Sequence, residues 1–302
     1  MPRVSVIIPT HSRPHLLPRA VESALRAGEG VEVIVVDDAS TDATAEVCRS
    51  LRGIRYIRLD RNQGVAGARN VGVLASTADF VAFLDDDDLR LLGSLEPQLK
   101  ELTADPAAGF VCGPVLCAAQ DGELTGEVSG PKTGSGDMFW ELLTLEFPVF
   151  PLTVVMRKEC FFTVGLFDRD APGVDDWDLL VRVAELYRVA VVSEPVGIYR
   201  VATPSSGQGT SGMPAHLKLV ARQHAKLMGL PRVAAATRAE RAAARRRVLN
   251  NISDILLWNI YTWLPHGAYR YSSSCLAMAL RLNPRGVFRP ATLRKGLKKL
   301  LR

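Results

Sequence analysis

The sequence predicts an α/β fold in which a mostly parallel sheet is flanked by helices and followed by a helical C-terminal region. Over the first hundred residues, short apolar runs typical of buried strands alternate with segments of helical periodicity, which is the rhythm of parallel βαβ units. The charge also divides the chain. Residues up to Arg200 hold 19 Lys and Arg against 30 Asp and Glu, whereas the remainder holds 18 against two. A second, basic unit is therefore expected at the C-terminal end.

The elements of the first hundred residues follow in strict order. We expect strands at 3–9, 31–36, 54–59 and 79–84, and helices near 14–27, 41–52, 65–75 and 91–103. Further along, Phe110–Val115 and Phe150–Met156 have the composition of strands, and a polar, glycine-rich stretch over 120–136 separates them. Asp176–Tyr187 carries apolar side chains at helical spacing. Ligands of parallel sheets bind beyond the carboxyl ends of the strands, so the loops after the first, second and fourth strands are expected to converge.

Three segments are expected along the chain: an α/β domain over 1–202, a flexible linker over 203–214 and a basic helical region over 215–302. The linker is rich in small residues, as mobile lids are. Beyond it, helical patterns occur at Arg238–Arg247, Ile252–Leu264 and Cys275–Leu282.

The last ten residues, Leu293–Arg302, place leucines on one helical face and Lys and Arg on the other. Such a helix suits an anionic membrane surface. A terminal helix docked on the domain explains the packing pattern equally well, but the lack of acidic residues favours the membrane.

The five cysteines show no paired metal spacing, so they indicate reduced thiols rather than a disulfide framework. The chain begins directly with the strand-like Val4–Ile8, and we expect no signal peptide. No apolar run approaches the roughly 18 residues that suggest a membrane span.

Four consecutive aspartates, Asp85–Asp88, follow the strand-like run Phe80–Leu84. Crowded carboxylates repel one another, and each favours its protonated form. A hard divalent cation such as Mg²⁺ or Mn²⁺ relieves that conflict, because such ions take carboxylate and phosphate oxygens as ligands. The alternative is a solvated acidic turn that caps a helix from about Leu91. The other motifs favour the cation.

A second pair of carboxylates, Asp37 and Asp38, ends the second strand. One of them can accept the imide N–H of a uracil or thymine ring, or the donors of guanine. The alternative is a cap for the helix after Ser40 and Thr41, which needs only one such residue. Two acids therefore favour a ligand role.

Two further segments carry weaker signals. Asn62–Asn70 opens the third helix with small residues that permit close backbone approach, and Arg69 can face a base or a phosphate. Gly173–Arg182 places acids at a helix start, where they favour the helix dipole. A carboxylate there could instead accept a hydroxyl proton, with Trp177 stacked on a sugar ring.

In this order, these segments resemble the motifs of family 2 glycosyltransferases, which are inverting enzymes with the GT-A fold. The matching segments are Ser5–Thr10, Val36–Asp42, Asn62–Asn70, Leu84–Asp88 and Asp175–Arg182. The resemblance covers about residues 3–200. It implies a nucleotide-diphosphate sugar as donor, a divalent cation, Mg²⁺ or Mn²⁺, and a single displacement at the anomeric carbon. The expected membrane position adds a glycan or lipid-linked acceptor in cell-surface glycan assembly.

The resemblance also implies roles for individual residues. The nucleotide-sugar site would comprise Pro9, Thr10, His11, Arg13, Asp38, Arg69 and Asp86. Within it, Asp38 would pair with the base and Asp86 would contact the ribose region. Asp85 and Asp87 correspond to the DxD acids of the metal site, Asp87 being the first choice for the direct ligand. Asp176 would be the general base, and Trp177 would contact the acceptor. Many members have a histidine two residues after Arg200, where this chain has Ala202.

Other functions fit the sequence less well. A sugar-nucleotide pyrophosphorylase should show a glycine-rich, arginine-containing loop after the first strand. A dehalogenase-type phosphatase should show a D-x-D-x-T/V motif at the end of a strand. This sequence has neither pattern at the corresponding strand ends. The basic C-terminal helices could serve a nucleic-acid-binding or non-catalytic binding protein. However, they lack aromatics clustered among the cations, so no nucleic acid is expected, and the presence of both Asp87 and Asp176 favours an active enzyme. We therefore expect a cytoplasmic enzyme held peripherally at the inner face of the cell membrane.

Overall fold

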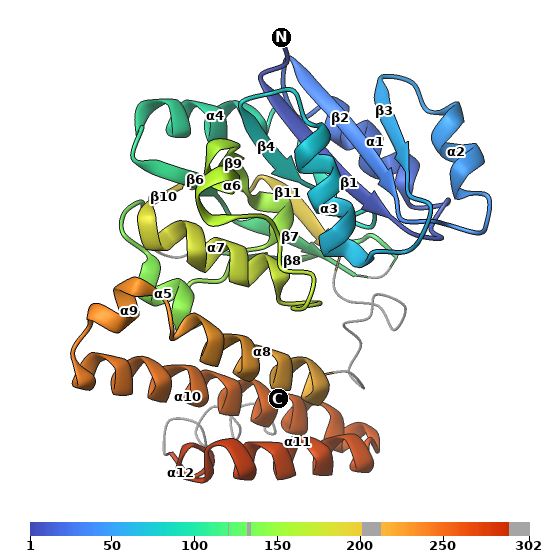
Figure 1. The fold of residues 1–302 in the computed structure, drawn as a ribbon. Helices are drawn as coiled ribbons and strands as arrows, with labels where there is room; N and C mark the ends of the chain where they lie inside the picture. Colours follow the sequence, from blue (N-terminus) through green and yellow to red (C-terminus); the bar gives the residue numbers. More distant parts are fainter. Residues whose placement is uncertain (120, 132–133, 201–212, 290–302) are drawn as a thin grey trace. The chain divides into compact units, whose positions relative to one another are not determined.

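The computed structural model describes residues 1–119, 121–131, 134–200 and 213–289 (Figure 1). The chain divides into two compact units. The first comprises Met1–Phe139 and Phe147–Val201, and the second comprises Trp140–Glu146 and Ala202–Arg302. The expected linker over 203–214 lies almost wholly outside the described residues.

A seven-stranded sheet forms the centre of the first unit, in the order β10-β6-β9-β4-β1-β2-β3. Its strands are β1 (Val4–Thr10), β2 (Val31–Asp37), β3 (Ile54–Arg58), β4 (Phe80–Phe83), β6 (Ala108–Cys112), β9 (Val155–Arg157) and β10 (Arg188–Val191). Neighbours pair in parallel except at β9, which is antiparallel to both β4 and β6. The predicted α/β fold with a mostly parallel sheet is confirmed.

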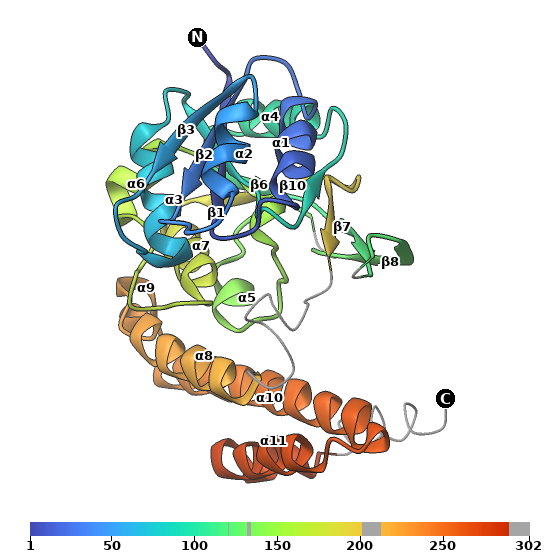
Figure 2. The ribbon, with the colours of Figure 1, turned by 90° about the vertical axis from the view of Figure 1, so that its right-hand side faces the viewer.

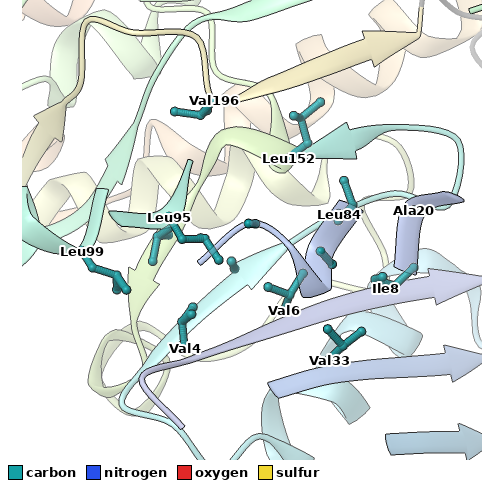
Figure 3. Packing of buried hydrophobic residues seen from close by; sticks show 14 of the residues in the cluster. Val4, Val6, Ile8, Ala20, Val33, Leu84, Leu95, Leu99, Leu152 and Val196 are labelled. Carbon is teal, nitrogen blue, oxygen red and sulfur yellow. The ribbon is translucent and has the colours of Figure 1, made fainter. Parts of the chain in front are cut away.

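Helices cover both faces of this sheet (Figure 2). They are α1 (Leu17–Leu25), α2 (Thr44–Ser50), α3 (Gly64–Ala75), α4 (Leu95–Ala104), α6 (Glu159–Val164) and α7 (Asp175–Leu186). Because side chains alternate along a strand, Val4, Val6 and Ile8 of β1 belong to the core that includes α1 and α4 (Figure 3). Ile7 points to the other face, where a Cβ on Gly72 of α3 would lie 2.3 Å from its Cγ2 atom. The absence of a side chain at Gly72 lets α3 pack closely on β1.

A smaller, four-stranded sheet has the order β5-β11-β7-β8. Its strands are β5 (Leu89–Arg90), β11 (Gly197–Arg200), β7 (Val115–Ala118) and β8 (Leu124–Ser129). Strand β8 lies in the polar, glycine-rich stretch over 120–136, where no strand was predicted. Five of its six residues are exposed, so it lacks the apolar alternation that marks a half-buried strand. Strand β5 directly follows the four aspartates, so the next helix, α4, begins at Leu95 instead of near Leu91.

Two predicted strands differ in their limits from the observed structure. The segment Phe110–Val115 spans the end of β6 and the start of β7. The segment Phe150–Met156 holds a 3₁₀ turn, η1 (Pro151–Thr153), before β9. A proline at the start of that turn favours helical dihedrals over extended ones.

The second unit is helical and contains α8 (Met213–Leu227), α9 (Pro231–Ala235), α10 (Arg238–Trp263), η3 (Leu264–His266), α11 (Tyr269–Leu282) and α12 (Pro284–Val287). The two helical patterns predicted over 238–264 form one helix, α10. It begins with a capping box between Thr237 and Glu240, and it packs against α11. None of the described helices is long and apolar enough to cross a bilayer. The predicted tail helix, Leu293–Arg302, lies outside the described residues.

The segment Trp140–Glu146 includes most of the short helix α5 (Phe139–Leu143) and was expected to belong to the α/β domain. Its grouping with the second unit has a physical cause. The carbonyl oxygen of Thr144 accepts a hydrogen bond from Asn251 Nδ2 of α10 at 2.8 Å.

A buried histidine on α8 makes the stability of the second unit depend on pH. His224 is 4% exposed, and its Nε2 atom has no hydrogen-bond partner among the described residues. Burial, together with the nearby Arg245, lowers the pKa of His224 to about 4. An unfolded histidine takes up its proton near pH 6.5. The neutral form of His224 therefore makes its full contribution to the free energy of unfolding above pH 6.5, and this contribution is lost as the pH falls towards 4. At about 1.4 kcal/mol per pKa unit, the loss is about 3 kcal/mol.

We expect a His224→Leu variant to lose this pH dependence, because leucine cannot take up a proton. The free energy of unfolding, measured with urea at pH 7 and pH 4, should fall by about 3 kcal/mol more in the wild type than in the variant. His15→Leu, at an exposed position, is the control and should behave as the wild type does. Equal pH dependence in the wild type and His224→Leu would contradict the assignment.

Candidate active site

Three loops at the carboxyl edge of the sheet form the candidate site. Strand β1 pairs in parallel with both β2 and β4, and Thr10 lies opposite Asp37. The residues that follow these strands are in direct contact. Thr10 Oγ1 donates a hydrogen bond to Asp86 at 2.7 Å, and His11 Nδ1 lies 2.7 Å from the carbonyl oxygen of Asp38. The convergence of these loops, expected from the topology, is thus observed.

The two acids that end β2 have different environments. Asp37 is fully buried and accepts hydrogen bonds from the hydroxyl of Tyr56 at 2.8 Å and from the backbone N–H of Ser40 at 2.9 Å. Asp38 accepts the backbone N–H of Gln63 at 2.7 Å through Oδ1. Asp37 therefore stabilises the turn, which is the role that a local cap requires. That division leaves Asp38 as the acid of this pair to be considered for the predicted base contact.

The four aspartates after β4 alternate between two environments. Asp86 and Asp88 are each 4% exposed, whereas the side chains of Asp85 and Asp87 are 35% and 19% exposed. Asp88 accepts the backbone N–H of Arg200 at 2.9 Å, which ties the run to β11. The run continues into β5, so it does not cap a helix. Asp85 and Asp87, the predicted metal ligands, are the two that face outward.

Arginines contact three of these acids. Arg13 Nη1 lies 3.0 Å from both Asp86 Oδ1 and Asp87 Oδ2. Arg69 Nη2 lies 2.7 Å from Asp85 Oδ1. The loop after β1 supplies Arg13, and helix α3 supplies Arg69. Both arginines were predicted to belong to the nucleotide-sugar site, and both lie against its acids.

The arginines do not remove the electrostatic conflict among the carboxylates. Burial raises the pKa of Asp86 to about 6, and burial followed by the charge of Asp85 raises the pKa of Asp87. Asp85 and Asp87 offer hard carboxylate oxygens, the ligand type that Mg²⁺ and Mn²⁺ prefer. The described residues contain no group of three or more acids, histidines or cysteines arranged around a metal position. Two carboxylates completed by substrate phosphates fit the usual magnesium site, so the residues present fit the predicted cation.

Three acids lie in the first turn of α7, and their partners distinguish them. Asp175 accepts hydrogen bonds from Arg69 Nη1 at 3.2 Å and from the backbone N–H of Gly173 at 3.2 Å. Asp178 pairs with Arg182 Nε at 2.8 Å. Asp176 accepts only the backbone N–H of Trp177, through Oδ1 at 2.7 Å, and its Oδ2 has no donor within the described part of the chain.

The chemistry of α7 follows from those partners. Burial, and next the charge of Asp175, raises the pKa of Asp176 to about 6. A carboxylate with a free oxygen and a pKa near neutrality can act as a general base. The neighbouring Asp178 has a structural role instead, because Arg182 also donates to the carbonyl oxygen of Leu166 at 2.8 Å.

A clamp that was not predicted from the sequence holds Arg69 in place. Asn70 Nδ2 donates to the carbonyl oxygen of Phe167 at 3.0 Å, and Asn70 Oδ1 accepts the N–H of Phe167 at 2.9 Å. The Phe167 ring lies under the guanidinium of Arg69, 5.6 Å from the ring centroid. The signal was the conspicuous pair Arg69-Asn70 itself, but its partner is almost a hundred residues away in sequence.

The remaining predicted residues take different positions. Pro9 is buried in β1, whereas His11 is exposed. Arg69 is 3% exposed and both its terminal nitrogens pair with carboxylates, so it has little surface to offer a base or a phosphate. Trp177 is half-buried beside Asp176. Ala202 lies outside the described residues.

Comparison with known sequences agrees with this geometry. The sequence model named "Glycosyl transferase family 2" matches residues 5–158. An uncharacterized glycosyltransferase of Haemophilus influenzae is 28% identical over 185 residues, which are 60% of this chain and 62% of the relative. A Campylobacter jejuni protein, GalNAc(5)-diNAcBac-PP-undecaprenol beta-1,3-glucosyltransferase, is 37% identical over 137 residues, 43% of each chain. The chain thus spans less than two thirds of the length of these two relatives.

Solved structures share the fold. The crystal structure of Staphylococcus aureus TarS 1-349 superposes with a TM-score of 0.63 and covers 97% of this chain and 92% of its own, at 16% sequence identity. The same protein with UDP-GlcNAc gives a TM-score of 0.58. The fold, the ordered motifs and a family match over half of the sequence agree with one another. The chain belongs to glycosyl transferase family 2.

Proposed function

We propose that this chain transfers a sugar from a nucleotide-diphosphate donor to an acceptor hydroxyl, with inversion at the anomeric carbon. One observation carries the proposal. Arg69 contacts both Asp85, of the acid run, and Asp175, next to Asp176, so a single side chain joins the predicted donor side to the predicted acceptor side. A direct displacement requires the donor and the general base to lie on either side of the same acceptor oxygen, and a shared arginine keeps their two sites adjacent.

On the donor side, Asp38 accepts the N–H donors of the base and the outward acids Asp85 and Asp87 hold Mg²⁺ or Mn²⁺. The cation, when bound, offsets the charge that grows on the departing diphosphate. Arg13 lies against Asp86 and Asp87 and provides a further positive charge beside the phosphates. UDP is the first nucleotide to test, since TarS structures of the same fold hold UDP and UDP-GlcNAc.

On the acceptor side, Asp176 takes the proton from the attacking hydroxyl. The free Oδ2 atom and the raised pKa support this assignment. A glycan or lipid-linked acceptor in cell-surface glycan assembly is supported by two relatives' names, the Campylobacter glucosyltransferase and a succinoglycan biosynthesis protein of Rhizobium meliloti. Trp177 lies beside Asp176 and offers a ring for the acceptor sugar.

We expect Asp87→Ala to abolish turnover and to remove the Mn²⁺-dependent part of UDP binding, because the carboxylate joins the cation to the phosphates. Thermal shift with UDP, GDP, dTDP and CDP, each with and without Mn²⁺, measures the binding. Asp60→Ala, at an exposed aspartate, is the control. A variant at Asp87 that binds nucleotide with unchanged Mn²⁺ dependence would exclude this ligand.

Asp176→Asn should lower the rate of sugar transfer by about 10²–10⁴-fold, since the amide keeps the size of the side chain but cannot take a proton. Nucleotide binding should survive, because the residue faces the acceptor. Asp178→Asn is a matched comparison on the same helix turn. If transfer to a verified acceptor stays near normal in Asp176→Asn, the base lies elsewhere.

A peripheral position at the inner face of the membrane is the second part of the proposal. Of the two acids after Val201, Glu240 is used in the cap of α10 and Asp254 pairs with Arg289 at 2.7 Å. The surface of α10 and α11 is therefore cationic. Exposed apolar side chains accompany the cations along α11 at helical spacing, namely Tyr269, Leu276 and Leu280. This mixture is typical of surfaces that lie on anionic lipid.

Charge reversal at Arg270 and Arg281, both exposed on α11, should weaken sedimentation with anionic liposomes at low salt. Each cation near such a surface contributes about 1 kcal/mol, which salt screens. Deletion of Leu293–Arg302 should weaken binding further. Reversal of Arg49 and Arg52, exposed in the first unit, is the control. Wild-type protein that ignores anionic liposomes but retains duplex DNA or RNA would identify a nucleic-acid surface instead.

A further inference from the structure

Arg69 is the most buried cation of the candidate site. It is 3% exposed, and its two terminal nitrogens divide between two carboxylates, Asp85 at 2.7 Å and Asp175 at 3.2 Å. Its Nε atom is buried without a hydrogen-bond partner in the described structure. The ring of Phe167 covers one face of the guanidinium. These contacts hold Arg69 in a single position and leave it little surface to offer a ligand.

We propose that Arg69 is a positioning residue, which stabilises the ionised form of Asp175 so that the proton is exchanged at the neighbouring Asp176. This inference rests on the proposed role of Asp176 as general base. It assigns Arg69 to the acid pair on α7, whereas the family resemblance suggested a nucleotide contact.

The geometry explains why the two adjacent acids differ. Both oxygens of Asp175 are engaged, Oδ2 by Arg69 and Oδ1 by the N–H of Gly173. Asp176 has one engaged oxygen, Oδ1, which accepts the N–H of Trp177. Burial raises the pKa of Asp175 too, but the charge of Arg69 and the N–H of Gly173 oppose that rise, so the proton goes first to Asp176.

Three charged groups act on Asp176. Asp175, from the same helix turn, and Asp85, from the loop after β4, disfavour its ionised form, whereas Arg69, from α3, favours it. Removing Arg69 should therefore raise the pKa of Asp176, and removing the charge of Asp175 should lower it. Neighbouring charges commonly move a pKa by about 1–3 units. Two substitutions in one ion pair thus have opposite expected effects.

The test is a ¹³C NMR titration of the aspartate carboxyl groups in the full chain without nucleotide, with the Asp176 signal identified by its loss in Asp176→Asn. In Arg69→Gln, the pKa of Asp176 should rise by about one unit or more, and in Asp175→Asn it should fall by a similar amount. In the double variant, the pKa of Asp176 should return towards the wild-type value. In Arg69→Lys, it should stay close to the wild-type value.

Breaking a buried ion pair destabilises a protein, so circular dichroism must show that each variant is folded. If Arg69→Gln does not fold, Asp175→Asn and Arg69→Lys still decide the question. If folded Arg69→Gln and Asp175→Asn shift the pKa of Asp176 in the same direction, or if folded Asp175→Asn leaves it unchanged, the proposal is overturned, because a purely structural role for Arg69 predicts no opposite signs.

Activity separates this inference from the proposed function. With a verified acceptor, the acidic limb of the pH profile of transfer should move with the pKa of Asp176 in each variant. Opposite NMR shifts with normal transfer by Asp176→Asn would sustain the role of Arg69 and reject Asp176 as the base. If Asp176→Asn loses transfer but the pKa of Asp176 is unchanged in Arg69→Gln and Asp175→Asn, Asp176 is supported as the base and the role of Arg69 is rejected.

Discussion

The parallel pairing of β1 with β2 and β4 is the constraint on which the candidate site depends. All seven residues of β1 are buried, and its side chains alternate between the two helical layers. A slip of one residue in its register would exchange these faces, so the core fixes the register strongly. The same register places the ends of three strands together, and with them Thr10, Asp38 and Asp86.

That arrangement concentrates negative charge at one edge of the sheet. Acids follow both β2 and β4, and more acids open α7, so the edge would be unstable without cations. Buried charges persist only where they are paired or hydrogen-bonded. Arg13 and Arg69 supply the pairing from two different elements, and Tyr56 and Thr10 supply hydroxyl donors. The carboxylates that keep partial exposure, Asp85 and Asp87, are the ones on which an added cation can act.

Periodicity allowed much of the fold to be predicted, because burial imposes it on the sequence. The four strands and four helices that were predicted for the first hundred residues lie close to their expected ranges. Strand β8 could not be predicted in this way, since mostly exposed residues form it and cross-strand pairing with β7 defines it. The continuity of α10 was missed because its basic and apolar halves differ in composition.

The candidate site was predictable to a similar depth. The order of the motifs identified which loops meet, but it did not show which side chains pair. Arg69 and Asp175 are separated by 106 positions, and Asn70 and Phe167 by 97, so no local pattern records their contacts. The sequence therefore predicts that Arg69 belongs to the nucleotide-sugar site, and the fold adds that its terminal nitrogens pair with Asp85 and Asp175.

Partner assignment, more than residue type, distinguishes the three acids of α7. Asp175, Asp176 and Asp178 are chemically identical, and all three favour the dipole of the helix. Two arginines from outside the first turn form ion pairs with two of these acids, Arg69 with Asp175 and Arg182 with Asp178. Among the described residues, Asp176 is the one of the three with no arginine partner and with one oxygen that accepts no hydrogen bond, and its pKa is raised to about 6. On the proposed role of Asp176, selectivity for a single proton acceptor arises from the placement of cations around a run of equivalent carboxylates.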